Sequence, residues 1–197
     1  MATSPSARDR ILETAYELFS RHGTHAVGVD AIVAASGVAK MSLYRNFGSK
    51  DELILAYLRR REELWTRDWL QGEVLERATD PVDRLLAIFD VFGEWFARPD
   101  YEGCAFVNVM LGIDDSTHPV RQASVEHLAT IRAFLSGLAA EAGVEDADAF
   151  ARQWHILMKG SLVAAAEGDE LAAARAQDMG GLLLKATLPE RVPPATS

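Results

Sequence analysis

Three features of the sequence predict an all-α fold with about nine helices. Apolar residues recur at helical spacing, as in the series Ile11, Leu12, Ala15, Leu18 and Phe19. Glycines and prolines separate the periodic stretches, and neither an internal repeat nor the alternating pattern of a strand is visible. The 197 residues are 49% hydrophobic and 25% charged, close to the average of folded globular proteins.

Composition also narrows the class of protein. The single cysteine, Cys104, excludes an internal disulfide framework and any cysteine-rich zinc module. No apolar run approaches the roughly 18 residues that a membrane span needs. The N-terminal residues have no apolar stretch behind their charges, unlike a secretory signal. We therefore expect a soluble cytoplasmic protein with no membrane partner, no metal and no other cofactor.

Charge is distributed unevenly along the chain. The net charge is -9, yet residues 1–61 carry nine basic and six acidic side chains, a net of +3, and residues 62–197 carry a net of -12. Between Val38 and Lys50 there are three basic residues and no acidic one. This asymmetry indicates a small domain that faces a polyanion, joined to an acidic body, although chance variation could produce it too.

The N-terminal third contains three short periodic segments and one long one. Residues 1–7 are small and polar, and we expect them to be disordered. Helices are predicted over residues 8–22, 29–35 and 39–47, with Gly28 as a weak N-cap of the second. Ser49 and Glu52 have the spacing of a capping box, and the helix that they begin meets no glycine or proline until Gly72.

The remaining two thirds is predicted to be helical as well. Asp80 and Pro81 begin a helix that ends before Pro99, and the apolar stretch 103–112 is expected to form a helix buried on all sides. Further helices are expected over 118–142, 147–167 and 170–185. We place domain boundaries at 1–50, 51–188 and 189–197, the last a disordered tail.

The second and third helices form a helix-turn-helix pattern, because Gly37 permits a sharp turn between them. The outer face of the third helix is then free to enter a DNA major groove. Lys40, Ser42, Tyr44 and Lys50 suit phosphate contacts, whereas Lys40, Met41 and Arg45 suit base edges. The complete predicted DNA-binding set is Lys40, Met41, Ser42, Tyr44, Arg45, Asn46 and Lys50.

The run from Gly23 to Leu53 resembles the DNA-binding domain of TetR-type transcriptional regulators. Gly37-Val38, Leu43-Tyr44, Phe47 and Ser49-Lys50-Asp51-Glu52-Leu53 all fall in register, over about a quarter of the chain. Two departures concern DNA contacts. The hydroxyl residue that is usual near Val27 and Gly28 is missing, so no phosphate contact is carried over there. Met41 stands where the family often has glycine, which should alter base preference.

The resemblance implies a helical ligand-binding domain and a homodimer. Residues from about 100 to 187 also resemble, less closely, the ligand domain of a subgroup that tends to respond to apolar or aromatic molecules. Glu102-Gly103-Cys104, Asp114 and His118-Pro119-Val120 carry that likeness. Candidate effector contacts are aromatic, methionine and isolated polar residues, each of which could instead belong to the core: Phe89, Phe92, Trp95, Phe96, Cys104, Phe106, Asn108, Met110, Arg132, Trp154, His155 and Met158.

Small residues in the last two helices suggest a helical dimer interface, because they allow close helix approach. Ordinary packing within the chain is the alternative. The predicted contacts are Leu157, Leu162, Ala165, Leu171, Met179, Leu182 and Leu183.

Two other functions compete with a ligand-responsive regulator. An enzyme is disfavoured, since the sequence lacks zinc-protease spacing, a nucleophile elbow and phosphate-binding glycine loops. A DNA-binding protein without an effector stays open. The preferred hypothesis is a homodimeric repressor, released from a pseudopalindromic DNA operator by a small apolar or aromatic effector.

Overall fold

The computed structural model describes residues 5–188 and confirms the all-α prediction, with no strand in that range. Helical structure is continuous from Lys50 to Arg77, through α4 (Lys50–Arg61), the π-helix η1 (Glu62–Gln71) and α5 (Gly72–Arg77). Counting this run once gives nine helices in the described range. The helical run continues past Gly72, the first glycine after Lys50, and the predicted tail at 189–197 lies outside the described residues.

The chain divides into two compact units that do not coincide with the predicted boundary at residue 50. Unit 1 comprises the described residues 5–68 and 102–129. It contains α1 (Ala7–His22), α2 (Val29–Ser36), α3 (Lys40–Phe47), α4, α7 (Ala105–Leu111) and the first part of α8 (Pro119–Glu141). In this unit α1 packs against α2, α3 and α4, and α7 packs against α4.

Short polar residues begin the first and fourth helices. The Ser6 hydroxyl accepts a hydrogen bond from the Asp9 N–H, and the Asp9 side chain accepts one from the Ser6 N–H. The expected disorder of residues 1–7 therefore does not extend to Ser6 and Ala7, because this capping box fixes the first turn. Ser49 likewise accepts from the Glu52 N–H at 3.1 Å, but the reciprocal bond from the Ser49 N–H to the Glu52 side chain is not formed.

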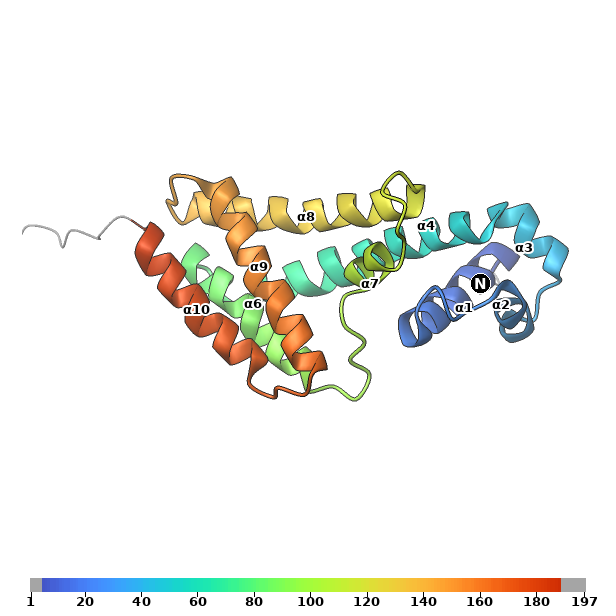
Figure 1. Cartoon of the computed structure of the whole chain (residues 1–197), viewed down its shortest axis with the longest axis horizontal. Helices are drawn as coiled ribbons and strands as arrows, with labels where there is room; N and C mark the ends of the chain where they lie inside the picture. The colour runs from blue at the N-terminus through green and yellow to red at the C-terminus, as the bar shows by residue number, and fades with distance from the viewer. Residues whose placement is uncertain (1–4, 189–197) are drawn as a thin grey trace, which may run out of the picture. The chain divides into compact units, whose positions relative to one another are not determined.

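Unit 2 comprises residues 69–101 and 130–188. It contains α5, α6 (Pro81–Phe96), α9 (Ala147–Ala166), α10 (Ala172–Thr187) and the second part of α8. Helices α6, α9 and α10 pack against one another, and α5 packs against α6 (Figure 1). The predicted Asp80 cap is present, since its carboxylate accepts from the Val82 N–H at 2.8 Å.

The expectation that residues 103–112 are buried on all sides is wrong. Phe106 and Val109 are buried in unit 1, but Asn108 is exposed and Leu111 is 70% exposed. The short helix α7 therefore has a buried face and an open one. A stretch of only seven residues can be almost entirely apolar without being enclosed, because surface apolar residues are common in folded proteins.

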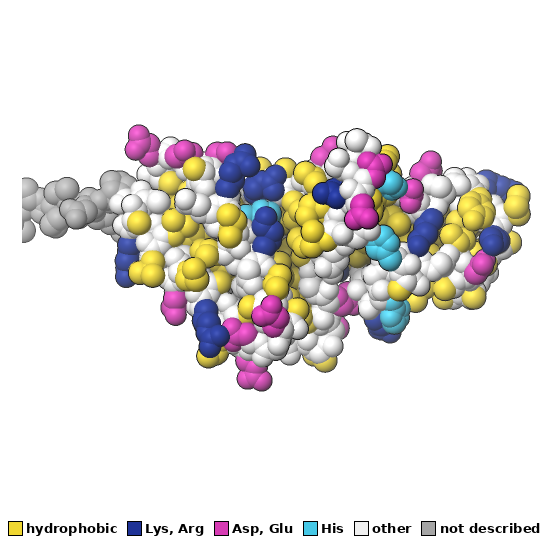
Figure 2. Space-filling model, in the orientation of Figure 1, with side chains coloured by type: hydrophobic (Ala, Val, Ile, Leu, Met, Phe, Trp, Pro, Cys, Tyr) yellow, Lys and Arg dark blue, Asp and Glu magenta, His cyan; other side chains and the backbone are white. Residues whose placement is uncertain are grey.

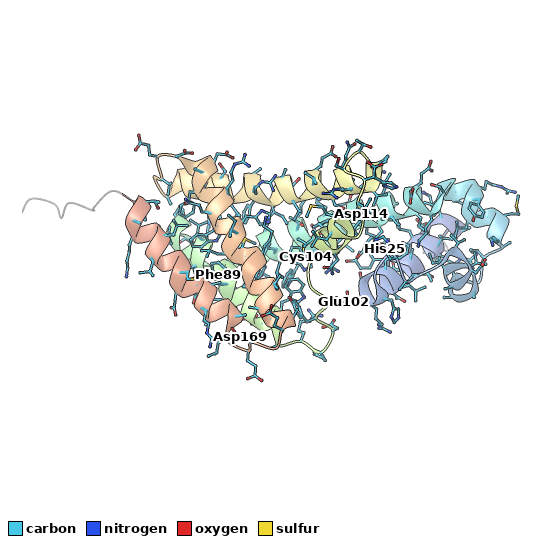
Figure 3. The ribbon with its side chains drawn as sticks, in the orientation of Figure 1. His25, Phe89, Glu102, Cys104, Asp114 and Asp169 are labelled. Carbon is cyan, nitrogen blue, oxygen red and sulfur yellow. The ribbon has the colours of Figure 1, made fainter. Side chains whose placement is uncertain are left out.

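Aromatic rings fill the interior of unit 2. Phe89 of α6 lies against α9 and α10, with its ring centroid 5.4 Å from that of Trp154 (Figure 3). Trp154 also stacks on Phe150 at 5.3 Å. Gly180 of α10 lies against these rings, and a Cβ atom there would stand 2.7 Å from the Trp154 ring. The absence of a side chain at position 180 is thus required for this packing.

None of the helices described is long and apolar enough to cross a membrane.

Replacing Gly180 with alanine should lower the free energy of unfolding by about 1–3 kcal/mol, because the added methyl overlaps the Trp154 ring. The matched change Gly137→Ala, in a mid-helix position of α8 with nothing within 4 Å, should raise it by up to about 1 kcal/mol through helix propensity. Urea unfolding of both variants measures the difference. Equal effects of the two substitutions would contradict the described packing.

Candidate nucleic-acid interface and effector region

The turn between α2 and α3 is built on Gly37. This residue ends α2 in the left-handed conformation, with φ 65° and ψ 24°, which a residue with a side chain rarely adopts. Ile32, Val38 and Leu43 are buried around the turn, so α2 and α3 share one apolar contact. The helix-turn-helix pattern predicted from the sequence is therefore present as a folded unit.

Helix α3 separates its buried and exposed residues clearly. Leu43 and Phe47 are buried, and the Arg8 guanidinium lies 4.9 Å from the Phe47 ring centroid. On the other side, Met41 is 72% and Tyr44 41% exposed. The predicted DNA-binding residues Lys40, Met41, Tyr44 and Arg45 are exposed, whereas Ser42, Asn46 and Lys50 are half-buried.

Two predicted contact residues already have partners within the unit. The Lys40 ammonium lies 2.7 Å from the Asp30 carboxylate, and this hydrogen bond raises the lysine pKa. Asn46 donates its side-chain amide to the Ser42 carbonyl at 2.7 Å. Asp30 was not among the predicted residues, and nothing in its sequence position indicates that it neutralises Lys40. Because a phosphate must compete with this acid, Lys40 is a weaker phosphate ligand than its charge suggests.

Lys50 stands at the first turn of α4, where backbone N–H groups favour an anion. The serine that caps this helix precedes it directly. No described acid forms an ion pair with Lys50, in contrast to Lys40. The predicted phosphate role therefore has firmer local support at Lys50.

Unit 1 also contains a close approach beside the helix-turn-helix segment. The imidazole of His25, in the segment before α2, lies so near Gly112 that a side chain at position 112 would overlap it. Gly112 directly follows α7. The end of α7 is thus in van der Waals contact with the segment that leads into α2, and residue spacing alone gives no sign of this.

The predicted effector residues divide between the two units. Phe106 of unit 1 is buried, and its ring centroid lies 5.1 Å from that of His127, whose Nδ1 is 3.0 Å from Glu62. Asn108 was predicted as a buried polar group, which is wrong: its exposed amide donates to the Glu102 carbonyl at 3.3 Å. Of the other two residues in unit 1, Cys104 is buried and Met110 half-buried.

In unit 2 most of the predicted aromatic residues form a connected core. Phe92, Trp95 and Phe96 have centroids 5.4–5.8 Å apart. Phe89, Trp154 and Met158 are buried as well. The described part of the chain contains no cluster of His, Cys, Asp and Glu that could hold a metal ion.

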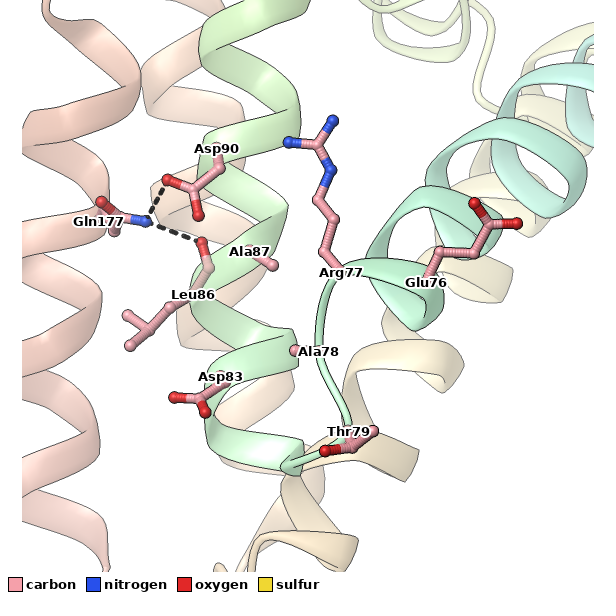
Figure 4. A pocket seen from close by; sticks show the side chains of 9 residues that line it. All are labelled: Glu76, Arg77, Ala78, Thr79, Asp83, Leu86, Ala87, Asp90 and Gln177. Carbon is pink, nitrogen blue, oxygen red and sulfur yellow. Dashed lines mark hydrogen bonds between the residues drawn. The ribbon is translucent and has the colours of Figure 1, made fainter.

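Two of the pockets in unit 2 are lined by none of the predicted effector residues. One, of about 700 Å³, lies against the α5–α6 connection, α6 and α10. Gln177 closes one side by donating to the Leu86 carbonyl and the Asp90 carboxylate (Figure 4). Its lining is largely polar and charged. The other, of about 360 Å³, is lined by residues that include Phe150 and Gln153.

His155 is a buried polar residue whose Nδ1 makes no hydrogen bond to any described residue. Its side chain is 2% exposed, and burial, with the charges of Lys159 and Arg132, lowers its pKa to about 3. The imidazole is therefore neutral near pH 7. The indole N–H of Trp154 is also buried without an acceptor among the described residues.

The predicted dimer residues differ in exposure. Leu171, Met179 and Leu182 are exposed on or next to α10, and Leu157, Ala165 and Leu183 are half-buried. Leu162 is buried within unit 2, and its carbonyl accepts a hydrogen bond from the Tyr101 hydroxyl at 2.8 Å. Two exposed apolar residues of α9, Ile156 and Val163, were not in the predicted set.

A helix-turn-helix unit with an exposed α3, followed by a helical body, defines the class of DNA-binding transcriptional regulators. Residues 11–57 match the family model "Bacterial regulatory proteins, tetR family", and residues 81–179 match "Tetracyclin repressor-like, C-terminal domain". The chain belongs to the TetR family of transcriptional regulators. This confirms the resemblance seen in residues 23–53. Members of this family are regulators and in general not enzymes.

Curated relatives with a stated role align with only part of this chain. The activator FasR of Mycolicibacterium smegmatis is 38% identical over 96 residues, 49% of this chain and 42% of that protein. The repressor KstR2 of the same organism is 34% identical over 87 residues, 43% and 40% of the two chains. The matched part of this chain thus spans about two fifths of these curated relatives.

Solved structures match over nearly the whole chain. A TetR-family regulator of Streptomyces coelicolor has a TM-score of 0.82 and 29% identity, covering 94% of this chain and 92% of its own. A candidate TetR-type regulator of Streptomyces avermitilis has a TM-score of 0.83 and 32% identity, covering 93% and 98%.

The lowered pKa of His155 predicts acid sensitivity. An unfolded histidine takes up a proton near pH 6.5, whereas the folded one does so only near pH 3, so stability is lost as the pH falls below 6.5. At pH 5 this loss should reach about 2 kcal/mol relative to pH 7. His155→Gln should remove that component, measured by urea unfolding at several pH values. Parallel pH profiles for the two proteins would contradict it.

Proposed function

We propose that this protein is a homodimeric repressor that binds a pseudopalindromic operator and leaves it when a small, largely apolar or aromatic effector binds. The observation that carries the proposal is the division of α3, which buries Leu43 and Phe47 and exposes Met41, Tyr44 and Arg45. A helix of this kind in a TetR-family chain is suited to the major groove.

Base reading is assigned to Lys40, Met41 and Arg45, and phosphate contact to Lys40, Ser42, Tyr44 and Lys50. Asn46 completes the set, although its amide is bonded to the Ser42 carbonyl in the free protein. The two α3 helices of a dimer would enter successive major grooves about 34 Å apart. The DNA-binding domain of residues 1–50 and the effector and dimer domain of residues 51–188 are part of this proposal, as is action in the cytoplasm.

Dimerisation is assigned to the open faces of α9 and α10. Several apolar side chains are exposed there together, and grouped exposed apolar side chains mark interaction surfaces. The residues that carry this argument are Ile156, Val163, Leu171, Met179 and Leu182. The space-filling view shows hydrophobic side chains gathered over this part of the molecule (Figure 2). A second copy is the partner that a pseudopalindromic site requires.

Repression is preferred to activation, although the relatives include the activator FasR as well as the repressor KstR2. An effector can release DNA only if it binds the released form more tightly than the DNA-bound form. Binding in the helical body would shift the helix that begins at Lys50 and so change the spacing of the two α3 helices.

The first test is selection of duplexes from a random DNA library at near-physiological salt. Recovery of an inverted repeat, bound by an even number of chains, is the expected result. Folded protein that enriches no sequence would overturn the regulator assignment. The selected duplex is then used to screen for small molecules that lower the affinity of the protein for it. A duplex that no effector releases would instead favour a DNA-binding protein of fixed occupancy.

Substitutions in and beside α3 should separate affinity from specificity. Lys50→Ala should weaken binding to all duplexes. It should also lower the slope of log affinity against log salt concentration by about one unit, because one phosphate contact is lost. Tyr44→Ala should weaken binding to all duplexes too. Arg45→Ala should reduce discrimination at one base pair by about 1–3 kcal/mol if it reads a guanine. Fluorescence anisotropy of matched and mismatched duplexes gives both quantities.

Lys185→Ala is the control for these variants, since it removes one exposed charge from α10 of unit 2. It should leave both affinity and salt slope unchanged. Loss of binding in this control, or unchanged binding in the Tyr44 and Lys50 variants, would show that the DNA face is misplaced.

The dimer surface is tested by adding acids to it. The double variant Met179→Glu/Leu182→Glu should raise the dissociation constant of the dimer at least about tenfold, because two charges would lose their hydration at the interface. Leu75→Glu changes an exposed leucine of α5 in the same way and should leave the dimer intact. Sedimentation equilibrium measures both, and an unchanged mass for the double variant would refute this interface.

A further inference from the structure

Five of the eight basic side chains described in unit 2 form an ion pair with a neighbouring acid. Among its described residues, every arginine but one takes part in an ion pair. The paired residues are Arg77, Arg84, Arg98, Arg152 and Arg175. Arg132 of α8 has no such partner, and neither has Lys159 of α9. This contrast is unexpected because acids outnumber bases in this part of the sequence.

Arg132 and Lys159 also differ from the remaining unpaired base, Lys185. Lys185 is exposed near the end of α10, where water solvates its charge, whereas Arg132 and Lys159 are half-buried. Holding a cation out of water without a counter-charge is unfavourable. Arg132 and Lys159 are thus the two basic residues of unit 2 that are half-buried and form no ion pair with a described acid.

The two cations act on the same buried histidine. Lys159 follows His155 by one helical turn, so their side chains are neighbours on α9. The charges of Lys159 and of Arg132, which lies on the preceding helix α8, both lower the pKa of His155. Figure 2 shows basic side chains gathered around a small histidine patch over α8 and α9.

The side chain of His155 gives a second, independent indication of a ligand site. Its Nδ1 is buried and makes no hydrogen bond within the described residues. A neutral imidazole carries one N–H donor, so this side chain can donate to an anion without bringing a charge of its own. An anion at this place would satisfy the imidazole and neutralise both cations.

We propose that Arg132, Lys159 and His155 bind the carboxylate of an amphipathic organic acid. The arginine suits a planar carboxylate, to which it can donate two parallel hydrogen bonds, and Lys159 adds a point charge. Buried apolar residues of the same helices, including Ile131, Leu135 and Met158, adjoin these positions in sequence and favour an acid with an apolar body. The inference rests on the proposed function and narrows its effector to an anionic class.

The decisive comparison uses two probes of nearly equal shape, 2-naphthoate and 2-naphthamide, titrated into the full-length protein by calorimetry. The wild type should bind the carboxylate at least about tenfold more tightly than the amide, since charge-assisted hydrogen bonds are the stronger ones. Arg132→Gln and Lys159→Gln should each reduce this preference to about threefold or less. Arg132→Lys should retain part of it.

Arg152→Gln is the matched control, because it removes one positive charge from α9 at an exposed residue already paired with Asp148. It should keep the full preference. An equal loss of the carboxylate preference in this variant would show that the effect comes from overall charge, and would overturn the site. So would equal affinity of the wild type for the two probes, or no binding of naphthoate at millimolar concentration.

The affinity for the selected duplex, measured without naphthoate or naphthamide, distinguishes failure of the anion site from failure of the regulator proposal. Arg132→Gln and Lys159→Gln should bind the selected duplex as the wild type does, and only the response to naphthoate should change. If no duplex is selected while the carboxylate preference holds, the regulator proposal fails and the anion site stands. Thermal unfolding of each variant verifies its fold, and Lys159→Gln alone suffices should Arg132→Gln not fold.

Discussion

The small shared core of α1, α2 and α3 is the constraint on which the DNA-facing part of the molecule depends. Eight residues of α3 must supply both the apolar contacts that fix the helix and the polar face that remains outside. Leu43 and Phe47 provide the first, and they can do so only because Gly37 turns the chain sharply after α2. The orientation of every exposed α3 side chain follows from those two buried residues.

Local signals in the sequence were sufficient for most of the fold. Helix positions followed from apolar periodicity and from caps such as Asp80, because both depend on residues close together in the chain. Features that join distant residues were not predictable. The Lys40–Asp30 ion pair and the contact of Gly180 with Trp154 need the tertiary arrangement, which single-sequence patterns do not encode.

The candidate sites show the same division. The exposed face of α3 could be predicted, since one buried residue per turn determines which side is free. The effector residues could not be sorted into core and contact, because an aromatic side chain at helical spacing serves either purpose. Asn108 illustrates the difficulty: an apolar neighbourhood in the sequence suggested burial, whereas its side chain is exposed. Arg132 could be distinguished from the other arginines of unit 2 only once their ion pairs were known, and His155 only once its burial was known.

The contact of Gly112 with His25 has a consequence for the divergence of relatives. The imidazole occupies the space that a side chain at position 112 would need, so the two residues cannot both be large in this arrangement. A homologue that acquires a bulkier residue at one position must reduce or redirect the other. The pair should therefore evolve jointly, as a steric link between the end of α7 and the segment that leads into α2.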